Sequence, residues 1–135
     1  MIIKEITIEQ VLPIRQIVMY PDQTLEELTL PHDHEGIHLG AFDQAHQLVS
    51  VVSLFKKEND MQFRKFATLQ KEQGKGYGKQ LLSHILEYSK VQQITRVWCN
   101  ARVNALGFYT QFGFKETNQT YHQDGYDFVI AELFL

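Results

Sequence analysis

Gln73-Gly74-Lys75-Gly76-Tyr77-Gly78 is the stretch of sequence that decides the fold. It follows an apolar run of β-branched and aromatic residues that ends near Leu69, and an amphipathic run begins at Tyr77, so a strand turns into a helix here. The first turn of a helix leaves backbone N–H groups without partners and carries roughly half a positive charge. Glycines remove the side chains that would keep a phosphate away from those N–H groups. The stretch therefore predicts a turn that cradles the pyrophosphate of a cofactor.

Length and composition indicate one domain. The chain has 135 residues, of which 44% are hydrophobic and 12% aromatic, enough for one sizeable core, and we expect a single domain over residues 1–135. The net charge is -3, without a long run of either sign, which argues against a nucleic-acid partner. The N-terminal residues do not resemble a signal peptide, and no stretch is apolar enough for a membrane helix. We expect a cytoplasmic protein without a membrane partner.

Hydrophobic periodicity predicts the elements on both sides of the glycine turn. We expect strands at residues 2–8, 37–42, 48–55 and 61–69, the last three in an antiparallel meander, with helices at 9–20 and 24–28. Pro13 is tolerable in the first of these helices only if it lies in the first turn. After the glycine turn we expect a helix from residue 77 to about 90, a strand at 94–101 parallel to strand 61–69, and a helix at 103–112 that Gly113 ends. A hairpin, 114–122 and 126–135, turns at Asp124-Gly125.

Two motifs and this element order resemble the GCN5-related N-acetyltransferase (GNAT) family over essentially the whole chain. The first motif, Gln/Arg-x-x-Gly-x-Gly/Ala, is present as Gln73 to Gly78. The second is the segment Asn100 to Tyr109 followed by Gly113-Phe114, which is similar to the family's Ala-x-x-x-Tyr-x-x-x-Gly-Phe ending. The resemblance implies an α/β (α+β) acyl-CoA N-acyltransferase fold. Its mixed, mostly antiparallel central sheet has six to seven strands, with helices on both faces.

The resemblance also implies the ligand and the site. Acetyl-CoA would be the cosubstrate, and Tyr109 would protonate the leaving sulfur, a role that suits a phenol with an unperturbed pKa of about 10. The residues implied to bind the cofactor lie on strand 61–69 and in the glycine turn: Phe66, Thr68, Gln73, Gly74, Lys75, Gly76, Tyr77, Gly78 and Lys79.

Two positions depart from the family pattern. Arg102 stands where members often have an asparagine that contacts pantetheine, which leaves that contact open. Gln62 stands where some members carry a glutamate general base, and a glutamine cannot accept a proton. The identity of a general base is therefore open.

Two arginines are candidates for the acceptor site. Arg15 interrupts the apolar run of the first helix, and Arg64 shares strand parity with Phe66 and Thr68, the parity that we assign to the cofactor side. A guanidinium in either place could bind a substrate carboxylate in a bidentate manner, and a structural or solvated ion pair is about equally compatible. The cluster His32-Asp33-His34 lacks a third ligand at a defined spacing, so we expect no metal site.

Other nucleotide-binding classes do not fit the glycine turn. A P-loop requires Ser or Thr after its lysine, whereas Gln80 follows Lys79, and a dinucleotide fingerprint has a different glycine spacing in an early βαβ unit. We therefore expect an acetyl-CoA-dependent N-acetyltransferase that transfers the acetyl group directly to a primary amine of a small molecule or a protein. The alternative is a non-catalytic acyl-CoA-binding module. A homodimer is common among the proteins that this chain resembles.

Overall fold

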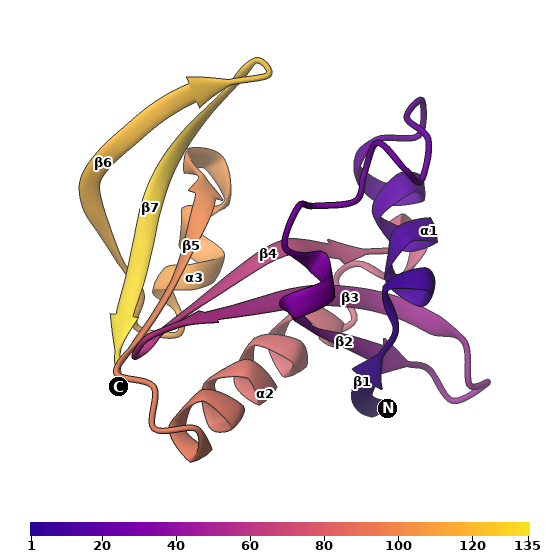
Figure 1. Ribbon diagram of the computed structural model, residues 1–135, viewed down its shortest axis with the longest axis horizontal. Coiled ribbons are helices and arrows are strands. Elements are labelled where there is room, and N and C mark those ends of the chain that lie inside the picture. Colours follow the sequence, from indigo (N-terminus) through magenta and orange to yellow (C-terminus); the bar gives the residue numbers. More distant parts are fainter. The chain divides into compact units, whose positions relative to one another are not determined.

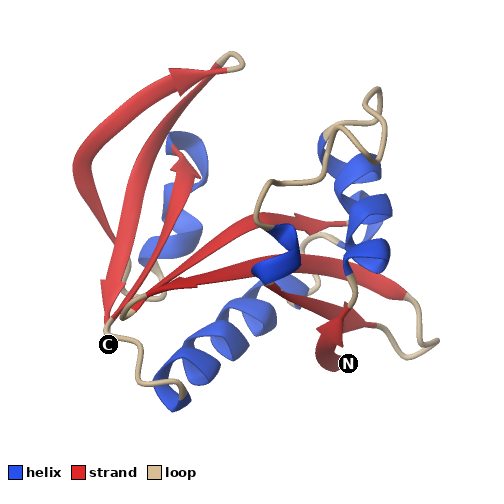
Figure 2. Ribbon diagram, in the orientation of Figure 1, coloured by secondary structure: helices blue, strands red, loops and turns tan.

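The computed structural model describes residues 1–135 and shows a mixed α/β protein with a seven-stranded sheet (Figures 1 and 2). The strand order is β1-β2-β3-β4-β5-β7-β6, and the pairing is antiparallel in β1–β2, β2–β3, β5–β7 and β6–β7 and parallel in β4–β5. The elements are β1 (Ile2–Ile6), α1 (Ile8–Met19), η1 (Asp33–Glu35), β2 (Ile37–Phe42), β3 (Leu48–Lys57), β4 (Asp60–Thr68), η2 (Gln70–Glu72), α2 (Tyr77–Val91), β5 (Arg96–Arg102), η3 (Val103–Ala105), α3 (Leu106–Thr110), β6 (Lys115–Gln123) and β7 (Tyr126–Phe134).

The chain divides into two compact units, which are described one at a time. Unit 1 contains residues 1–55 and 63–88, and unit 2 contains residues 56–62 and 89–135. None of the α-helices combines the length and the apolar character that crossing a bilayer requires. The expectation of one domain over residues 1–135 stays a prediction.

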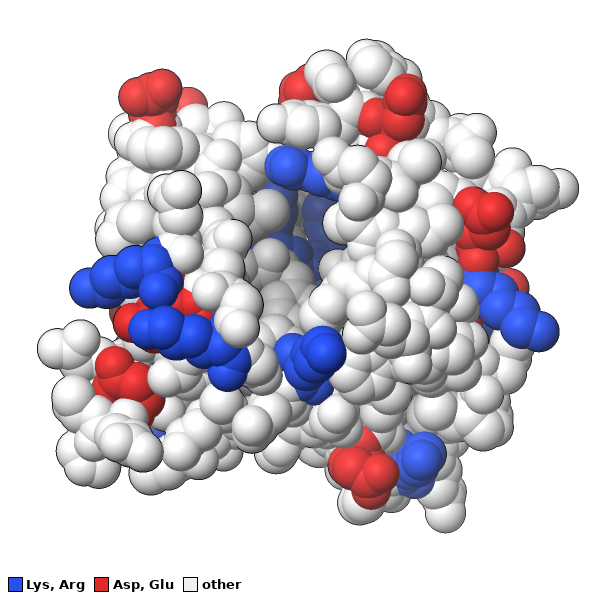
Figure 3. Space-filling view, turned by 180° about the vertical axis from the view of Figure 1, so that it is seen from behind, with Lys and Arg blue, Asp and Glu red and all other residues white.

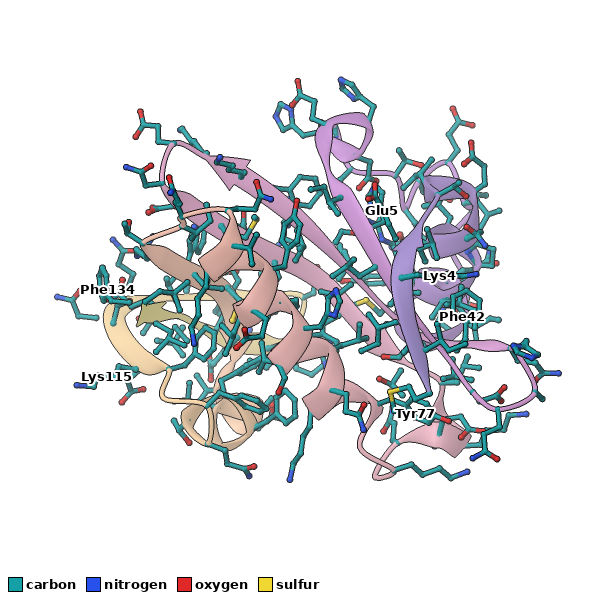
Figure 4. The ribbon with its side chains drawn as sticks, turned by 90° about the horizontal axis from the view of Figure 1, so that it is seen from below. Lys4, Glu5, Phe42, Tyr77, Lys115 and Phe134 are labelled. Carbon is teal, nitrogen blue, oxygen red and sulfur yellow. The ribbon has the colours of Figure 1, made fainter.

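Unit 1 packs α1 and α2 against its strands. Figures 1 and 4 show the two helices on opposite faces of these strands. On the α1 face, Val11 and Ile14 join a buried cluster with Ile6, Val51 and Ala67, while Leu81, Leu82 and Ile85 of α2 are also fully or almost fully buried. At the edge of the sheet, the Lys4 ammonium lies 4.7 Å from the centroid of the Phe42 ring (Figure 4).

Two local expectations for unit 1 were wrong. Pro13 lies inside α1, five residues after Ile8, instead of in the first turn, so the helix continues past a residue that cannot donate a backbone hydrogen bond. Thr7 caps this helix through a reciprocal capping box with Gln10. The helix expected at 24–28 is a single turn, in which the Leu28 amide donates to the Thr24 carbonyl at 3.2 Å.

A left-handed residue changes the facing of side chains along β4. Lys65 has φ of 55°, and the rings of Phe63 and Phe66 make an edge contact with centroids 6.1 Å apart. Residues three apart in a regular strand point to opposite faces, so this contact shows that Lys65 is an extra residue of the bulge type. The expectation that Arg64 shares a face with Phe66 and Thr68 was therefore wrong.

Unit 2 is built on β5, β7 and β6, with α3 beside β5 (Figure 1). Buried and partly exposed residues alternate along β5, with Val97, Cys99 and Ala101 on the buried face. The parallel pairing of β5 with β4 joins Asp60–Gln62 to Arg96–Trp98, as the crossover helix predicted. Asp124 and Gly125 turn the final hairpin with φ of 53° and 81°, which is the pair of left-handed residues that a two-residue hairpin turn favours.

Charged side chains of both signs lie on the face shown in Figure 3. On this face, several Lys and Arg side chains gather near the middle of the view, and Asp and Glu side chains lie mostly toward its outline, among uncharged surface. In unit 2, Lys115 at the start of β6 and Phe134 at the end of β7 both lie at the open end of the hairpin (Figure 4). Phe134 is 66% exposed.

A buried ion pair holds α1 to the rest of unit 1. The Arg15 guanidinium is fully buried and donates to both carboxylate oxygens of Asp33, at 2.8 and 2.9 Å, as well as to the Leu28 carbonyl and the Ser53 hydroxyl. Burial acts to raise the pKa of the Asp33 carboxyl, but hydrogen bonds from Arg15 and from the Leu30 amide, with the charge of Arg15, outweigh it and lower the pKa. Asp33 is therefore held as a carboxylate inside unit 1.

Removing Arg15 alone should destabilise the protein strongly. Arg15→Met leaves the Asp33 charge buried without its partner, and we expect the free energy of unfolding to fall by about 3–5 kcal/mol. In the double variant Arg15→Met/Asp33→Leu neither charge remains, so much of the loss should be recovered. Urea unfolding measures both values, and Arg64→Met, at a partly exposed position, is the control. Additive losses in the double variant would contradict this account.

Candidate functional site

The glycine turn has the backbone conformation of an anion cradle. Gly74 and Gly76 have φ of 81° and 93°, a left-handed region that residues with a side chain rarely adopt. A Cβ atom built at either position would meet no atom within 4 Å. The glycines therefore leave open space in front of the backbone, just before α2 begins at Tyr77.

Hydrogen bonds tie the turn to strand β4. The Gln73 side chain donates from Nε2 to the Thr68 carbonyl at 3.1 Å, and the Gln80 amide donates to the Gly76 carbonyl at 3.1 Å. The Thr68 hydroxyl lies 2.7 Å from the Ser50 hydroxyl. Because Gln80 is the residue that bonds back to Gly76, the amides of Tyr77, Gly78 and Lys79 are in the first turn, where helix N–H groups lack intrahelical partners.

The charges around the turn are partly paired. Lys75, between the two left-handed glycines, places its Nζ 3.0 Å from Glu72 Oε2. Glu72 is mostly buried, with 14% of its side chain exposed, whereas 58% of the Lys75 side chain is exposed. Lys79 is exposed on the first turn of α2. Open space, amides of a helix start and two lysines fit a phosphate-bearing ligand.

Tyr109 lies in unit 2, against Cys99. Its ring makes edge contacts with Phe108 and Phe114, at centroid distances of 5.2 and 5.9 Å. Burial raises the pKa of the Tyr109 phenol above its usual value, and the neighbouring Cys99 raises it further. Burial also raises the pKa of the Cys99 thiol to about 12. Both groups therefore keep their protons at neutral pH, so Tyr109 has a proton to donate and Cys99 is an unreactive thiol.

The structure brings together the predicted residues of the glycine turn, and Phe66 and Thr68 lie at the end of β4 that leads into it. Arg15 is held in the buried ion pair with Asp33, and this geometry favours the structural of the two roles considered for it. Arg64 is partly exposed on β4, on the face opposite Phe66.

Residues that the sequence interpretation missed complete the buried network of Arg15. The Ser53 hydroxyl lies 2.7 Å from His38 Nδ1, and His38 Nε2 lies 2.9 Å from the Asp33 carbonyl. Since a carbonyl only accepts, Nε2 donates to it, and with a neutral imidazole Ser53 donates to Nδ1 while it accepts from Arg15. Both ring nitrogens of His38 are engaged, so His38 is not a free base. His32 and His34 are exposed beside Glu35, and no group of three or more potential ligands gathers to hold a metal ion.

The chain belongs to the GNAT family of acetyltransferases. Residues 5–133 match the family described as "Acetyltransferase (GNAT) domain", and the chain is accordingly an acetyltransferase. It is 30% identical over 132 residues to the uncharacterized N-acetyltransferase YitI of Bacillus subtilis (strain 168), covering 91% of this chain and 88% of that protein.

Solved structures show the same fold. The ribosomal-protein-S18-alanine N-acetyltransferase from Escherichia coli has a TM-score of 0.79 at 16% identity, covering 98% of this chain and 92% of the other. A GNAT family acetyltransferase from Elizabethkingia anophelis with acetyl-CoA bound has a TM-score of 0.77 at 16% identity, covering 99% and 97%. The expected acyl-CoA N-acyltransferase fold is confirmed.

Glu72 should weaken anion binding at the turn. Its carboxylate neutralises Lys75 and repels a phosphate, so Glu72→Gln should bind inorganic pyrophosphate a few-fold more tightly, the modest size expected of a partly exposed ion pair. Isothermal titration calorimetry at low salt measures the change, which should shrink as salt is added. The matched control, Glu87→Gln on an exposed site of α2, should leave the affinity unchanged. Equal affinities of wild type and Glu72→Gln would contradict this role.

Proposed function

We propose that the protein is an acetyl-CoA-dependent N-acetyltransferase that transfers the acetyl group directly to a primary amine. The observation that carries the proposal is the open, left-handed turn at Gly74 and Gly76 at the start of α2, in a chain of the GNAT family. Structures of the same fold with coenzyme A or acetyl-CoA bound support the choice of cosubstrate. A small-molecule or protein acceptor, a homodimer and a cytoplasmic location stay predictions.

Different residues would bind the pyrophosphate and the pantetheine arm of acetyl-CoA. The amides of Gly74 to Gly78 and the side chains of Lys75 and Lys79 would hold the pyrophosphate, with Gln73 fixing the turn to Thr68. Phe66 and Thr68 would offer backbone groups to the pantetheine arm. Acetyl-CoA supplies an activated thioester carbonyl, which an amine attacks. The bulge at Lys65 interrupts the regular strand ladder just before Phe66, which supports such a use of backbone groups.

Tyr109 is the proposed acid. A thiolate that leaves the thioester requires a proton, and a partly buried phenol with a raised pKa holds its proton throughout the physiological range. Gln62 has no carboxylate that could act as a base, and both ring nitrogens of His38 are hydrogen-bonded. The amine would therefore enter in its neutral form or lose its proton to water. Membership of an acetyltransferase family and the protonated Tyr109 disfavour the alternative of a non-catalytic acyl-CoA-binding module.

Gly76→Glu should abolish acetyl-CoA binding. A glutamate at this position places bulk and negative charge in the open space of the cradle, and it strains a backbone with φ of 93°. Gly125→Glu is the matched control, because Gly125 also has a left-handed φ of 81° and open surroundings but lies in the β6–β7 turn. Calorimetric titration with acetyl-CoA should show binding to wild type and to the control only. Failure of the wild type to bind would refute the proposed function.

Tyr109→Phe should slow turnover while leaving acetyl-CoA affinity near normal. Loss of a general acid lowers kcat by about a hundredfold. Because the pKa of Tyr109 is raised, the acid form persists as pH rises, so wild-type kcat should not fall between pH 8 and 10 through this group. Coenzyme A release in an amine panel measures kcat, and Tyr88→Phe, which removes one hydroxyl from α2, is the control. An unchanged kcat would show that Tyr109 is not the general acid and contributes only to packing.

A further inference from the structure

One face of unit 2 carries a cluster of aromatic rings around an arginine. Arg102 of β5, Phe128 of β7 and Tyr121 of β6 stand opposite one another in the strand registers, and Tyr126 is two residues from Phe128 on the same face. We call these four residues the Arg102 surface. It lies on the face of β5 opposite Cys99, the residue that neighbours Tyr109.

The rings and the guanidinium of the Arg102 surface hold each other in place. The Arg102 guanidinium lies 3.9 Å from the centroid of the Tyr126 ring. The rings of Tyr121 and Phe128 are stacked, with centroids 5.0 Å apart and an interplanar angle of 10°. Tyr121 is 39% exposed and Tyr126 is 43% exposed, so the surface presents flat apolar groups to solvent. Stacking on an aromatic ring leaves the edge of a guanidinium available for hydrogen bonds.

A second arginine on the same face of β5 shows what Arg102 lacks. Arg96 is paired with two carboxylates, Glu132 Oε1 at 2.7 Å and Asp60 Oδ2 at 3.1 Å. Arg102 has no carboxylate at ion-pair distance, and its contact is with the Tyr126 ring. The guanidinium fork matches a carboxylate in a bidentate manner, so the chemistry of Arg102 suits a planar anion with an apolar, flat neighbour.

We propose that the Arg102 surface binds a carboxylate next to a flat apolar group, and that the acetyl acceptor is an amine that carries this carboxylate. The second half rests on the proposed function. Its support is connectivity: β5 ends at Arg102, and η3 and α3 follow directly and carry Tyr109. A ligand bound to Arg102 therefore contacts the residue from which the chain continues into the segment that holds the proposed acid, whereas the features that fit phosphates lie in the glycine turn.

Phenylacetate tests the receptor without requiring acetyl transfer. It has a carboxylate and a flat ring but no amine, and phenylacetamide is the matched compound without the charge. In NMR titrations, phenylacetate should shift the backbone amide signals of residues 102 and 121–128, and phenylacetamide should bind about tenfold more weakly, the scale of a charged hydrogen bond. Arg102→Gln should remove this preference. Arg96→Lys, which keeps a positive charge beside Asp60 and Glu132, should retain it. Equal binding of the two compounds to wild type would overturn the receptor.

Two dipeptides test the acceptor half. Gly-Phe and Gly-Phe amide share the amine and the ring and differ in the carboxylate. With acetyl-CoA, kcat/KM should be about tenfold higher for Gly-Phe in wild type, and Arg102→Gln should lose this preference with acetyl-CoA affinity unchanged. A tenfold loss of acetyl-CoA affinity in Arg102→Gln would overturn the assignment, because the anion would then belong to the cosubstrate. Equal use of the dipeptides would overturn it also. If acetyl-CoA does not bind wild type at all, the proposed function fails while the phenylacetate result stands.

Discussion

The buried ion pair between Arg15 and Asp33 is the constraint on which unit 1 depends. Taking a guanidinium and a carboxylate out of water is costly, and good geometry with further hydrogen bonds offsets the cost. Both terminal nitrogens of Arg15 have such partners, whereas its Nε is buried without one. Here one side chain from α1 contacts η1, a carbonyl of the preceding turn, and β3 through Ser53. An apolar contact tolerates sliding, but a bidentate pair does not, so this network sets the position of α1 along the sheet.

The predictable part of the fold is the part that local sequence encodes. Hydrophobic periods and the Asp124-Gly125 turn are local signals, and they located most of the strands, α1, α2 and the final hairpin to within a few residues. The misses have tertiary causes. Packing of Val11 and Ile14 into the core carries α1 through Pro13, and the bulge at Lys65, which has no local turn signal, changes which side chains of β4 share a face.

The candidate site also has a part that local sequence predicts and a part that depends on the assembled structure. The glycine turn is a contiguous motif whose conformation follows from its own residues, so its role could be inferred from the sequence. Asp33, the partner of Arg15, is far along the chain and looked like part of a histidine cluster. The Arg102 surface depends on the register of three strands, and register is fixed by the assembled sheet rather than by any one segment. Alternating aromatics at Tyr126 and Phe128 were the available signal for it.

The division of the chain into two units has a consequence for how the protein forms. The hairpin tip between β3 and β4, residues 56–62, belongs to unit 2, while the longer parts of both strands belong to unit 1, and α2 changes unit after Tyr88. The polypeptide therefore passes from one unit to the other three times, and neither unit is an uninterrupted piece of sequence. Synthesis reaches the last residue of unit 1 at Tyr88, when only the hairpin tip of unit 2 has been made. Every residue of unit 1, including the glycine turn, is therefore synthesised before Tyr109.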